Sequence, residues 1–138
     1  MIILTEKEKN ELVSKAFRAS KNSYSPYSGY KIGAAIMTDE RRIFTGTNIE
    51  NSTYGATVCA ERVALFKAVS EGYRSFSAIA VASEDVFPVP CGICRQVIAE
   101  FCNDITVLVA EEKGKYREYS LSELLPDRFI CTSGGKKK

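Results

Sequence analysis

The sequence predicts an α/β fold: a three-layer α/β/α sandwich in which helices cover both faces of a mixed, five-stranded sheet. The first observation behind this prediction is that apolar residues switch between the helical and the strand period, in the order αββαβαββα. The second is that the 138 residues contain no internal repeat and no linker. A chain of this length can bury a core of its own, so we expect one domain over residues 1–133.

The first part of the chain predicts a helix followed by an antiparallel hairpin. Thr5 and Glu8 form a capping-box pattern. The apolar residues that follow share one helical face, so this helix should run to about Asn22. The next elements are, in order, a break at 24–29, a strand over 32–37, a polar turn at 39–41 and a strand over 43–49.

Beyond the hairpin, helices and strands alternate. Gly is a favourable residue just past the end of a helix, and Ser120 with Glu123 repeats the capping-box pattern. Short apolar runs between the helices indicate buried strands. The expected elements are a helix from near Cys59 to Gly72, a strand over 77–82, a helix from near Cys91 to Phe101, strands over 105–110 and 116–119, and a short helix that ends at Pro126.

The chain has five cysteines and no histidine. Without histidine there is no Ser-His or Cys-His nucleophile pair, no His-ligated zinc and no imidazole acid or base. A general base must therefore be a carboxylate, a lysine, a tyrosine or a thiolate. A site for a soft metal ion must be built from cysteine sulfur.

The net charge of +2 comes from the C-terminus. Removing Lys136–Lys138 from the 19 basic residues leaves 16 against 17 acidic residues. The body therefore lacks the basic stripe of a nucleic-acid-binding domain, and we expect no nucleic-acid partner. No apolar run approaches the ~20 residues of a membrane span, so we expect a cytoplasmic protein without a membrane partner. Residues 134–138 are expected to be a disordered, Lys-rich tail.

Three of the cysteines fall where helices are expected to begin: Cys59 at one helix, Cys91 and Cys94 at the next. Helix N-termini stabilise thiolates, and positions i and i+3 share a helical face. A buried cysteine is often only a small apolar residue, which is our interpretation of Cys131. The Cys91/Cys94 pair also fits a thioredoxin-like redox motif.

A structural zinc site with Cys102 as fourth ligand conflicts with helix geometry. Cys102 lies eight residues after Cys94, about 12 Å along the same helix, and one ion with ~2.3 Å bonds cannot reach both. Three cysteines with an open fourth position are typical of catalytic zinc.

Glu61 weakens the redox interpretation. Cys59-Ala60-Glu61 followed by Pro90-Cys91-Gly92-Ile93-Cys94 reproduces the order of the zinc-deaminase signature. In a regular helix, Cys59 and Glu61 would point about 200° apart. Both can face one site only if Cys59 lies at the cap, outside helical geometry, and we predict that it does.

The chain resembles the small, homotetrameric cytidine deaminases of pyrimidine nucleoside salvage along most of its length. The matching blocks are Tyr24-Ser25-Pro26-Tyr27-Ser28, Gly33-Ala34-Ala35, Asn48-Ile49-Glu50-Asn51, Cys59-Ala60-Glu61-Arg62, Pro90 to Gln96 and Leu124-Leu125-Pro126. The resemblance implies a cytidine deaminase-like fold. It also implies hydrolysis of cytidine and deoxycytidine to uridine and deoxyuridine with release of ammonia.

The resemblance also implies the roles of the residues in the metal site. Cys59, Cys91 and Cys94 would hold one Zn²⁺ per subunit. Glu61 would carry a proton from the attacking water to ring N3 and would then protonate the departing amine. Three thiolates overbalance the two charges of zinc, so Arg62 would donate hydrogen bonds to the sulfurs, and Arg95 is a second candidate donor.

Other residues would recognise the substrate. Asn48 and Glu50 match positions that bind the ribose hydroxyls in similar enzymes; the alternative is that they only organise their loop. Ala60 and Tyr30 would line the pocket, with Tyr30 in place of the usual Phe. Phe129 would stack on the base from a neighbouring subunit, and Tyr54 would lie at the interface between subunits. Asp127 and Arg128 replace the small residues that usually precede Phe129.

Two alternatives remain open on the sequence. The first is deamination of another base, such as blasticidin S or a base in RNA or DNA. The intact 48–51 block favours a free ribose, and the absence of a basic stripe disfavours polynucleotides. The second is a zinc-stabilised or thiol-redox binding protein without hydrolytic activity.

Overall fold

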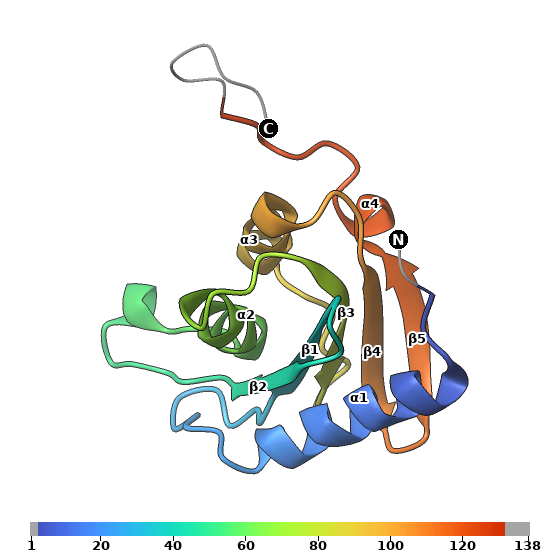
Figure 1. Cartoon of the computed structure of the whole chain (residues 1–138). Helices are drawn as coiled ribbons and strands as arrows, with labels where there is room; N and C mark the ends of the chain where they lie inside the picture. The colour runs from blue at the N-terminus through green and yellow to red at the C-terminus, as the bar shows by residue number, and fades with distance from the viewer. Residues whose placement is uncertain (1–2, 132–138) are drawn as a thin grey trace.

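The computed structural model describes residues 3–131, so the tail at 134–138 lies outside the described residues. The chain forms a five-stranded sheet between two helical layers (Figure 1). The elements are α1 (Glu6–Ser20), β1 (Gly33–Thr38), β2 (Ile43–Thr47), the short 3₁₀ helix η1 (Tyr54–Ala56), α2 (Ala60–Ser70), β3 (Phe76–Ala82), α3 (Gly92–Phe101), β4 (Thr106–Glu112), β5 (Lys115–Ser120) and α4 (Leu121–Leu124).

The sheet has the strand order β2-β1-β3-β4-β5 and is mixed, as the sequence predicted. β1 pairs antiparallel with both β2 and β3, and β4 pairs antiparallel with β5. β3 and β4 are parallel, and α3 provides the crossover that parallel neighbours require. The mixed three-layer α/β/α fold is therefore confirmed.

One strand ends earlier than the sequence predicted. β2 ends at Thr47 rather than Ile49, and Ile49 instead makes isolated bridges with Tyr24 and Val58. The chain leaves the sheet here because it connects two loops, one before β1 and one before α2. This departure matters for the site, since Asn48 and Glu50 flank the bridge residue.

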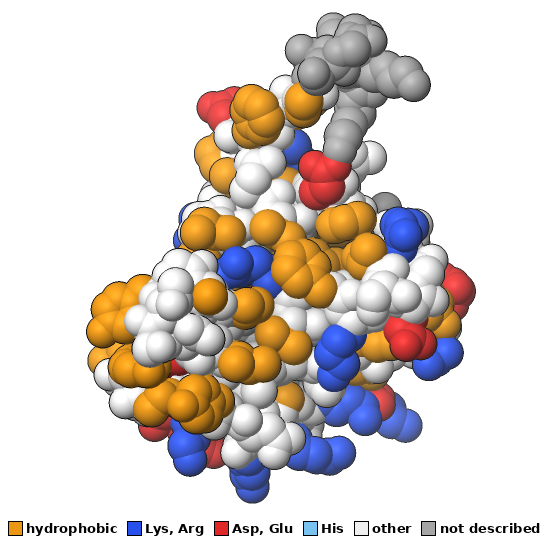
Figure 2. Space-filling model, turned by 90° about the vertical axis from the view of Figure 1, so that its left-hand side faces the viewer, with side chains coloured by type: hydrophobic (Ala, Val, Ile, Leu, Met, Phe, Trp, Pro, Cys, Tyr) orange, Lys and Arg blue, Asp and Glu red, His pale blue; other side chains and the backbone are white. Residues whose placement is uncertain are grey.

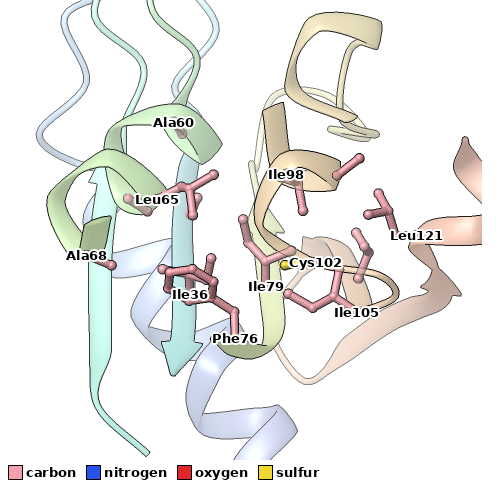
Figure 3. Packing of buried hydrophobic residues seen from close by; sticks show 14 of the residues in the cluster. Ile36, Ala60, Leu65, Ala68, Phe76, Ile79, Ile98, Cys102, Ile105 and Leu121 are labelled. Carbon is pink, nitrogen blue, oxygen red and sulfur yellow. The ribbon is translucent and has the colours of Figure 1, made fainter. Parts of the chain in front are cut away.

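Helices cover the two faces of the sheet unequally. α1 packs alone on one face, while α2 and α3 lie side by side on the other (Figure 1). The core on the α1 face is built from Leu12, Ala16 and Phe17 against small strand residues. On the other face, Figure 3 shows Ile36 and Ile79 of the central strands between Leu65 of α2 and Ile98 of α3.

Close packing fixes the start of α2. A Cβ atom at Gly46 would lie 2.5 Å from the backbone nitrogen of Ala64 and 2.7 Å from the carbonyl oxygen of Ala60. Only glycine lets β2 approach the first turns of α2 this closely, and Glu61 lies in the first of them. Across residues 3–131, no helix has the length and apolar character needed to cross a membrane.

Candidate active site

The N-termini of α2 and α3 bring three sulfur atoms together. Cys59 is the N-cap of α2 and Cys91 is the N-cap of α3, both with extended backbone (ψ 154° and 167°). Cys94 follows in the first turn of α3 and is buried. The prediction that Cys59 lies at the cap, outside helical geometry, is confirmed.

The spacing of the sulfurs fits a zinc ion. The three Sγ atoms all lie within 4.8 Å of one another, and those of Cys59 and Cys91 are 3.8 Å apart. Tetrahedral ligands with Zn–S bonds of about 2.3 Å are about 3.8 Å apart. Cys102 lies at the far end of α3 as its C-cap and is not part of this group. The donor set is therefore three cysteine sulfurs, contributed by the first turns and caps of two neighbouring helices.

Positive groups offset the charge of the sulfurs. The Arg62 Nη2 atom donates to Cys59 Sγ at 3.5 Å, and Arg62 Nε is buried without a partner among residues 3–131. Hydrogen bonds, first from the Cys94 thiol and then from Arg62, lower the pKa of Cys59 to about 5. The lowered pKa of Cys59 favours its thiolate, the form in which cysteine binds metal.

Arg95 does not act as the second donor that the sequence suggested. Its Nε donates to the carbonyl oxygen of Pro90 at 2.8 Å and its Nη1 to that of Leu124 at 2.7 Å. Arg95 therefore fastens the loop before Cys91 to the end of α4. The sequence could not show this, because Leu124 is 29 residues away along the chain.

Glu61 is a buried carboxyl group, with only 4% of the residue exposed. Burial removes it from water and raises its pKa to about 7, and the negative charge of Cys59 acts in the same direction. A carboxyl group with this pKa can both accept and release a proton near neutral pH.

Glu61 lines a cavity of about 220 Å³ together with Cys59, Ala60 and Cys91. The wall also includes Asn48 and Glu50, in addition to Ser28, Ile32, Thr57, Val58, Pro88 and Val89. Cysteine sulfur, a proton-carrying carboxyl group and two polar side chains from a separate loop thus share one space.

Asn48 organises the loop before β1. Its Oδ1 atom accepts hydrogen bonds from Ser23 Oγ at 2.5 Å and from the Ile32 backbone N–H at 3.0 Å. Its Nδ2 donates to the Tyr30 carbonyl oxygen at 2.8 Å. An amide nitrogen has two hydrogens, so one donor of Asn48 is left.

Glu50 is bound to the same loop through both carboxylate oxygens. Oε1 accepts from the backbone N–H groups of Tyr27 at 2.9 Å and Ser28 at 3.1 Å, and Oε2 accepts from Ser28 Oγ at 2.5 Å. Oε2 keeps one acceptor position. Asn48 and Glu50 therefore hold the loop before β1, and not only their own loop after β2 as the alternative had it. Each side chain retains one hydrogen-bonding position.

The aromatic residues singled out from the sequence lie outside this cavity. Tyr54 is 74% exposed and makes an edge contact with Tyr27, with ring centroids 5.8 Å apart. Phe129 is 75% exposed and lines a different cavity, and Tyr30 is half exposed. Figure 2 shows apolar side chains gathered across the face on the α2 side of the molecule, with basic side chains mainly along its lower edge.

The segment that carries Phe129 is fixed to α3 by residues that the sequence did not reveal. The Arg128 guanidinium donates to the carbonyl oxygens of Ala99 and Cys102 at 2.9 and 2.6 Å, at the end of α3. The Gln96 side chain donates to and accepts from the backbone of Phe129, at 3.0 and 3.1 Å. The large Arg128 thus satisfies helix-end carbonyl groups rather than disturbing the segment.

Comparisons with known proteins agree with this geometry. Residues 6–110 match the family model described as the cytidine and deoxycytidylate deaminase zinc-binding region. The chain is 48% identical over 121 residues to a cytidine deaminase of Sporosarcina psychrophila, covering 86% of this chain and 89% of that protein. It is 46% identical over 126 residues to one of Halalkalibacterium halodurans, covering 90% and 96%.

A solved structure extends the likeness to three dimensions. The crystal structure of cytidine deaminase from Burkholderia pseudomallei superposes with a TM-score of 0.83 at 42% identity, covering 91% of this chain and all of that one. The family model spans the three cysteines and Glu61, and the relatives cover nearly the whole described fold. The chain therefore belongs to the cytidine deaminase family.

Proposed function

We propose that this protein catalyses the zinc-dependent hydrolytic deamination of cytidine and deoxycytidine to uridine and deoxyuridine, with release of ammonia, in pyrimidine nucleoside salvage. The observation that carries the proposal is that Glu61, buried and with a pKa of about 7, shares a cavity with Cys59 and Cys91 of the three-sulfur cluster. The family membership supports the choice of cytosine as the base.

One zinc ion per subunit would be held by Cys59, Cys91 and Cys94. Zinc supplies, when bound, the Lewis acidity that activates water at neutral pH. Arg62 and the two helix N-termini reduce the surplus negative charge of three thiolates. Since the ligands must stay reduced, we infer a cytoplasmic location.

Glu61 would move the protons of the reaction. Its carboxylate would take a proton from the attacking water and deliver it to N3 of the base. The same carboxylate would then take the second proton from the new hydroxyl group at C4 and deliver it to the departing amine, which leaves as ammonia. A pKa of about 7 suits both directions of transfer. No other titratable side chain with a pKa near neutrality is needed.

Asn48 and Glu50 would bind the sugar. The remaining donor of Asn48 and the remaining acceptor of Glu50 can pair with a single hydroxyl group, which both accepts and donates. A phosphate offers no such donor when ionised, and the charge of Glu50 repels it. This pair therefore favours a nucleoside over a nucleotide.

Neighbouring copies of the chain would complete the pocket in a homotetramer. Phe129, Tyr54 and Tyr30 are exposed in the single chain, although large aromatic side chains favour burial. The apolar face in Figure 2 offers a surface for such an assembly. Phe129 from one subunit would then stack on the base in another, and residues 1–133 of each copy would act as one domain of the larger assembly.

Substitution of Glu61 by glutamine tests the mechanism. The variant should keep one zinc per chain and lose cytidine turnover by about 10²–10⁴-fold or more, because the amide carries no titratable proton. Glu71→Gln, at the other end of α2, is the matched control and should retain turnover. Retained turnover in Glu61→Gln would reject the mechanism, and loss of zinc would assign Glu61 a structural role.

A further inference from the structure

We propose that Ser28 is a positioning residue for this reaction, which orients the Glu50 carboxylate toward the sugar of the substrate. The inference rests on the proposed function and adds a residue to it. Ser28 lies in the turn before β1, and both Ser28 and Glu50 line the cavity that contains Glu61.

The turn is shaped to receive a carboxylate. Gly29 adopts a positive φ of 77°, and its N–H donates to the Ser25 carbonyl oxygen at 3.0 Å, which closes the turn. The two consecutive N–H groups of Tyr27 and Ser28 then converge on Glu50 Oε1. Successive backbone N–H groups of this kind form an anion-binding concavity.

The hydroxyl group of Ser28 adds the bond that fixes the second oxygen. Ser28 Oγ accepts from the Tyr30 backbone N–H at 3.1 Å, so its own proton is free to be donated to Glu50 Oε2 at 2.5 Å. Ser28 therefore binds both carboxylate oxygens, one through its backbone and one through its side chain. With both oxygens held, the remaining acceptor position of Oε2 has a fixed direction.

Because Glu50 is buried, its carboxylate depends on the hydrogen bonds that this turn provides. Glu50 is only 9% exposed, and a buried carboxylate depends on hydrogen bonds to remain charged. The Ser28 hydroxyl is the largest contribution that lowers the pKa of Glu50. Ser28 itself is exposed, and its side chain bonds only to Glu50 and to the Tyr30 N–H among the hydrogen bonds of the described chain.

The test is the kinetic split in Ser28→Ala with cytidine as substrate. Loss of a charge-assisted hydrogen bond should raise KM by about tenfold while kcat stays within about twofold. Ser28→Thr keeps the hydroxyl and should restore KM. Ser25→Ala removes a hydroxyl from the same turn without touching Glu50 and is the control. An unchanged KM in Ser28→Ala, or a fall in kcat alone, would overturn the inference.

A second measurement separates positioning from general damage to the fold. The dissociation constant for uridine, the product, is compared in a double-mutant cycle with Glu50→Ala. Ser28→Ala should weaken uridine binding when Glu50 is present and have no further effect when it is absent. An equal effect in both backgrounds would overturn the inference.

Two further measurements distinguish a role of Ser28 in substrate binding from a folding defect and from a failure of the proposed activity. If the alanine variant does not fold, Ser28→Cys, a weak donor, should show the same rise in KM, and a wild-type KM there overturns the inference. If the zinc-loaded wild-type chain does not deaminate cytidine, the proposed function fails. If it does so but Ser28→Ala is unaffected, only the role of Ser28 fails.

Discussion

The pocket at the N-termini of α2 and α3 differs from the segment that follows α4 in how far the single chain buries the side chains and provides their partners. In the pocket, Cys94 and Glu61 are buried and the sulfurs have partners within the chain. After α4, the backbone of Phe129 is held by Gln96 while its ring is 75% exposed. One chain therefore builds the chemical centre by itself, while the ring of Phe129 is left exposed in the single chain.

A single helix connects these two regions. The first turn of α3 carries Cys94 and follows its cap Cys91, and its last turn provides the carbonyl groups that Arg128 binds. The side chain of Gln96 lies between them in sequence and bonds to Phe129. The backbone that carries the exposed ring is thus held by the same helix that positions two of the three sulfurs.

The largest effect is expected from removing a sulfur in the buried region. Cys94→Ala should abolish both zinc binding and turnover, because two thiolates cannot replace the three-sulfur donor set. Cys102→Ala removes the other buried cysteine of α3 and should keep zinc, since it lies at the far end of the helix. A metal assay on both variants checks this, and the opposite pattern would mean that the zinc site is misassigned.

A smaller loss of turnover is expected when the charge beside the sulfurs is removed. Arg62→Ala should keep zinc and lower kcat by about 10–100-fold, the usual range for residues that support metal ligands. The three thiolates would then keep their full negative charge and weaken the Lewis acid. Steady-state kinetics, with zinc content measured on the same sample, test this. An unchanged kcat would show that Arg62 does not support the zinc ligands.

Phe129→Ala tests the exposed region and should raise KM for cytidine by about 5-fold or more with little change in kcat, since stacking on a base contributes about 1–3 kcal/mol. Mixing this variant with inactive Glu61→Gln subunits sharpens the test. Mixed assemblies should recover part of the affinity if Phe129 acts on a neighbouring pocket. A KM that neither the substitution nor the mixing changes would contradict the shared pocket.

The smallest effect concerns the stability of the loop that carries Glu50. The Ser28 hydroxyl and the N–H groups of Ser28 and Tyr27 hold the pKa of Glu50 below its ordinary value of 4.5. A lowered pKa stabilises the folded state above pH 4.5, and this contribution is lost as the pH falls through the folded-state value. Glu50→Gln should therefore lower the free energy of unfolding at neutral pH but not in acid. Urea titrations at neutral and at acidic pH measure this, and an equal loss of unfolding free energy at the two pH values would contradict it.

Local rules predicted the parts of the molecule that depend on neighbouring residues. The capping box at Thr5 and the sulfur spacing at Cys91 and Cys94 are short-range patterns, and both appear in the structure. The cap position of Cys59 followed from helix geometry combined with the zinc-deaminase signature, which places Glu61, two residues later, in the same site.

Contacts between distant segments could not be predicted in the same way. The roles of Arg95 and Arg128 depend on which carbonyl groups the fold brings near them, 26 to 29 residues away. Asn48 and Glu50 were expected to bind a sugar or to hold a loop, and the structure shows the loop contacts while leaving one hydrogen-bonding position on each. The number of free hydrogen-bonding positions could not be predicted from the sequence, because it depends on which tertiary partners occupy the others.

Deamination by the zinc-loaded chain can be measured directly from the ultraviolet absorbance of cytidine with the purified protein, while zinc is measured in the same sample. We expect one zinc per chain, a steady loss of the cytidine absorbance and one ammonia released for each cytidine consumed. A sample with full zinc content that leaves the absorbance of cytidine unchanged would contradict this expectation.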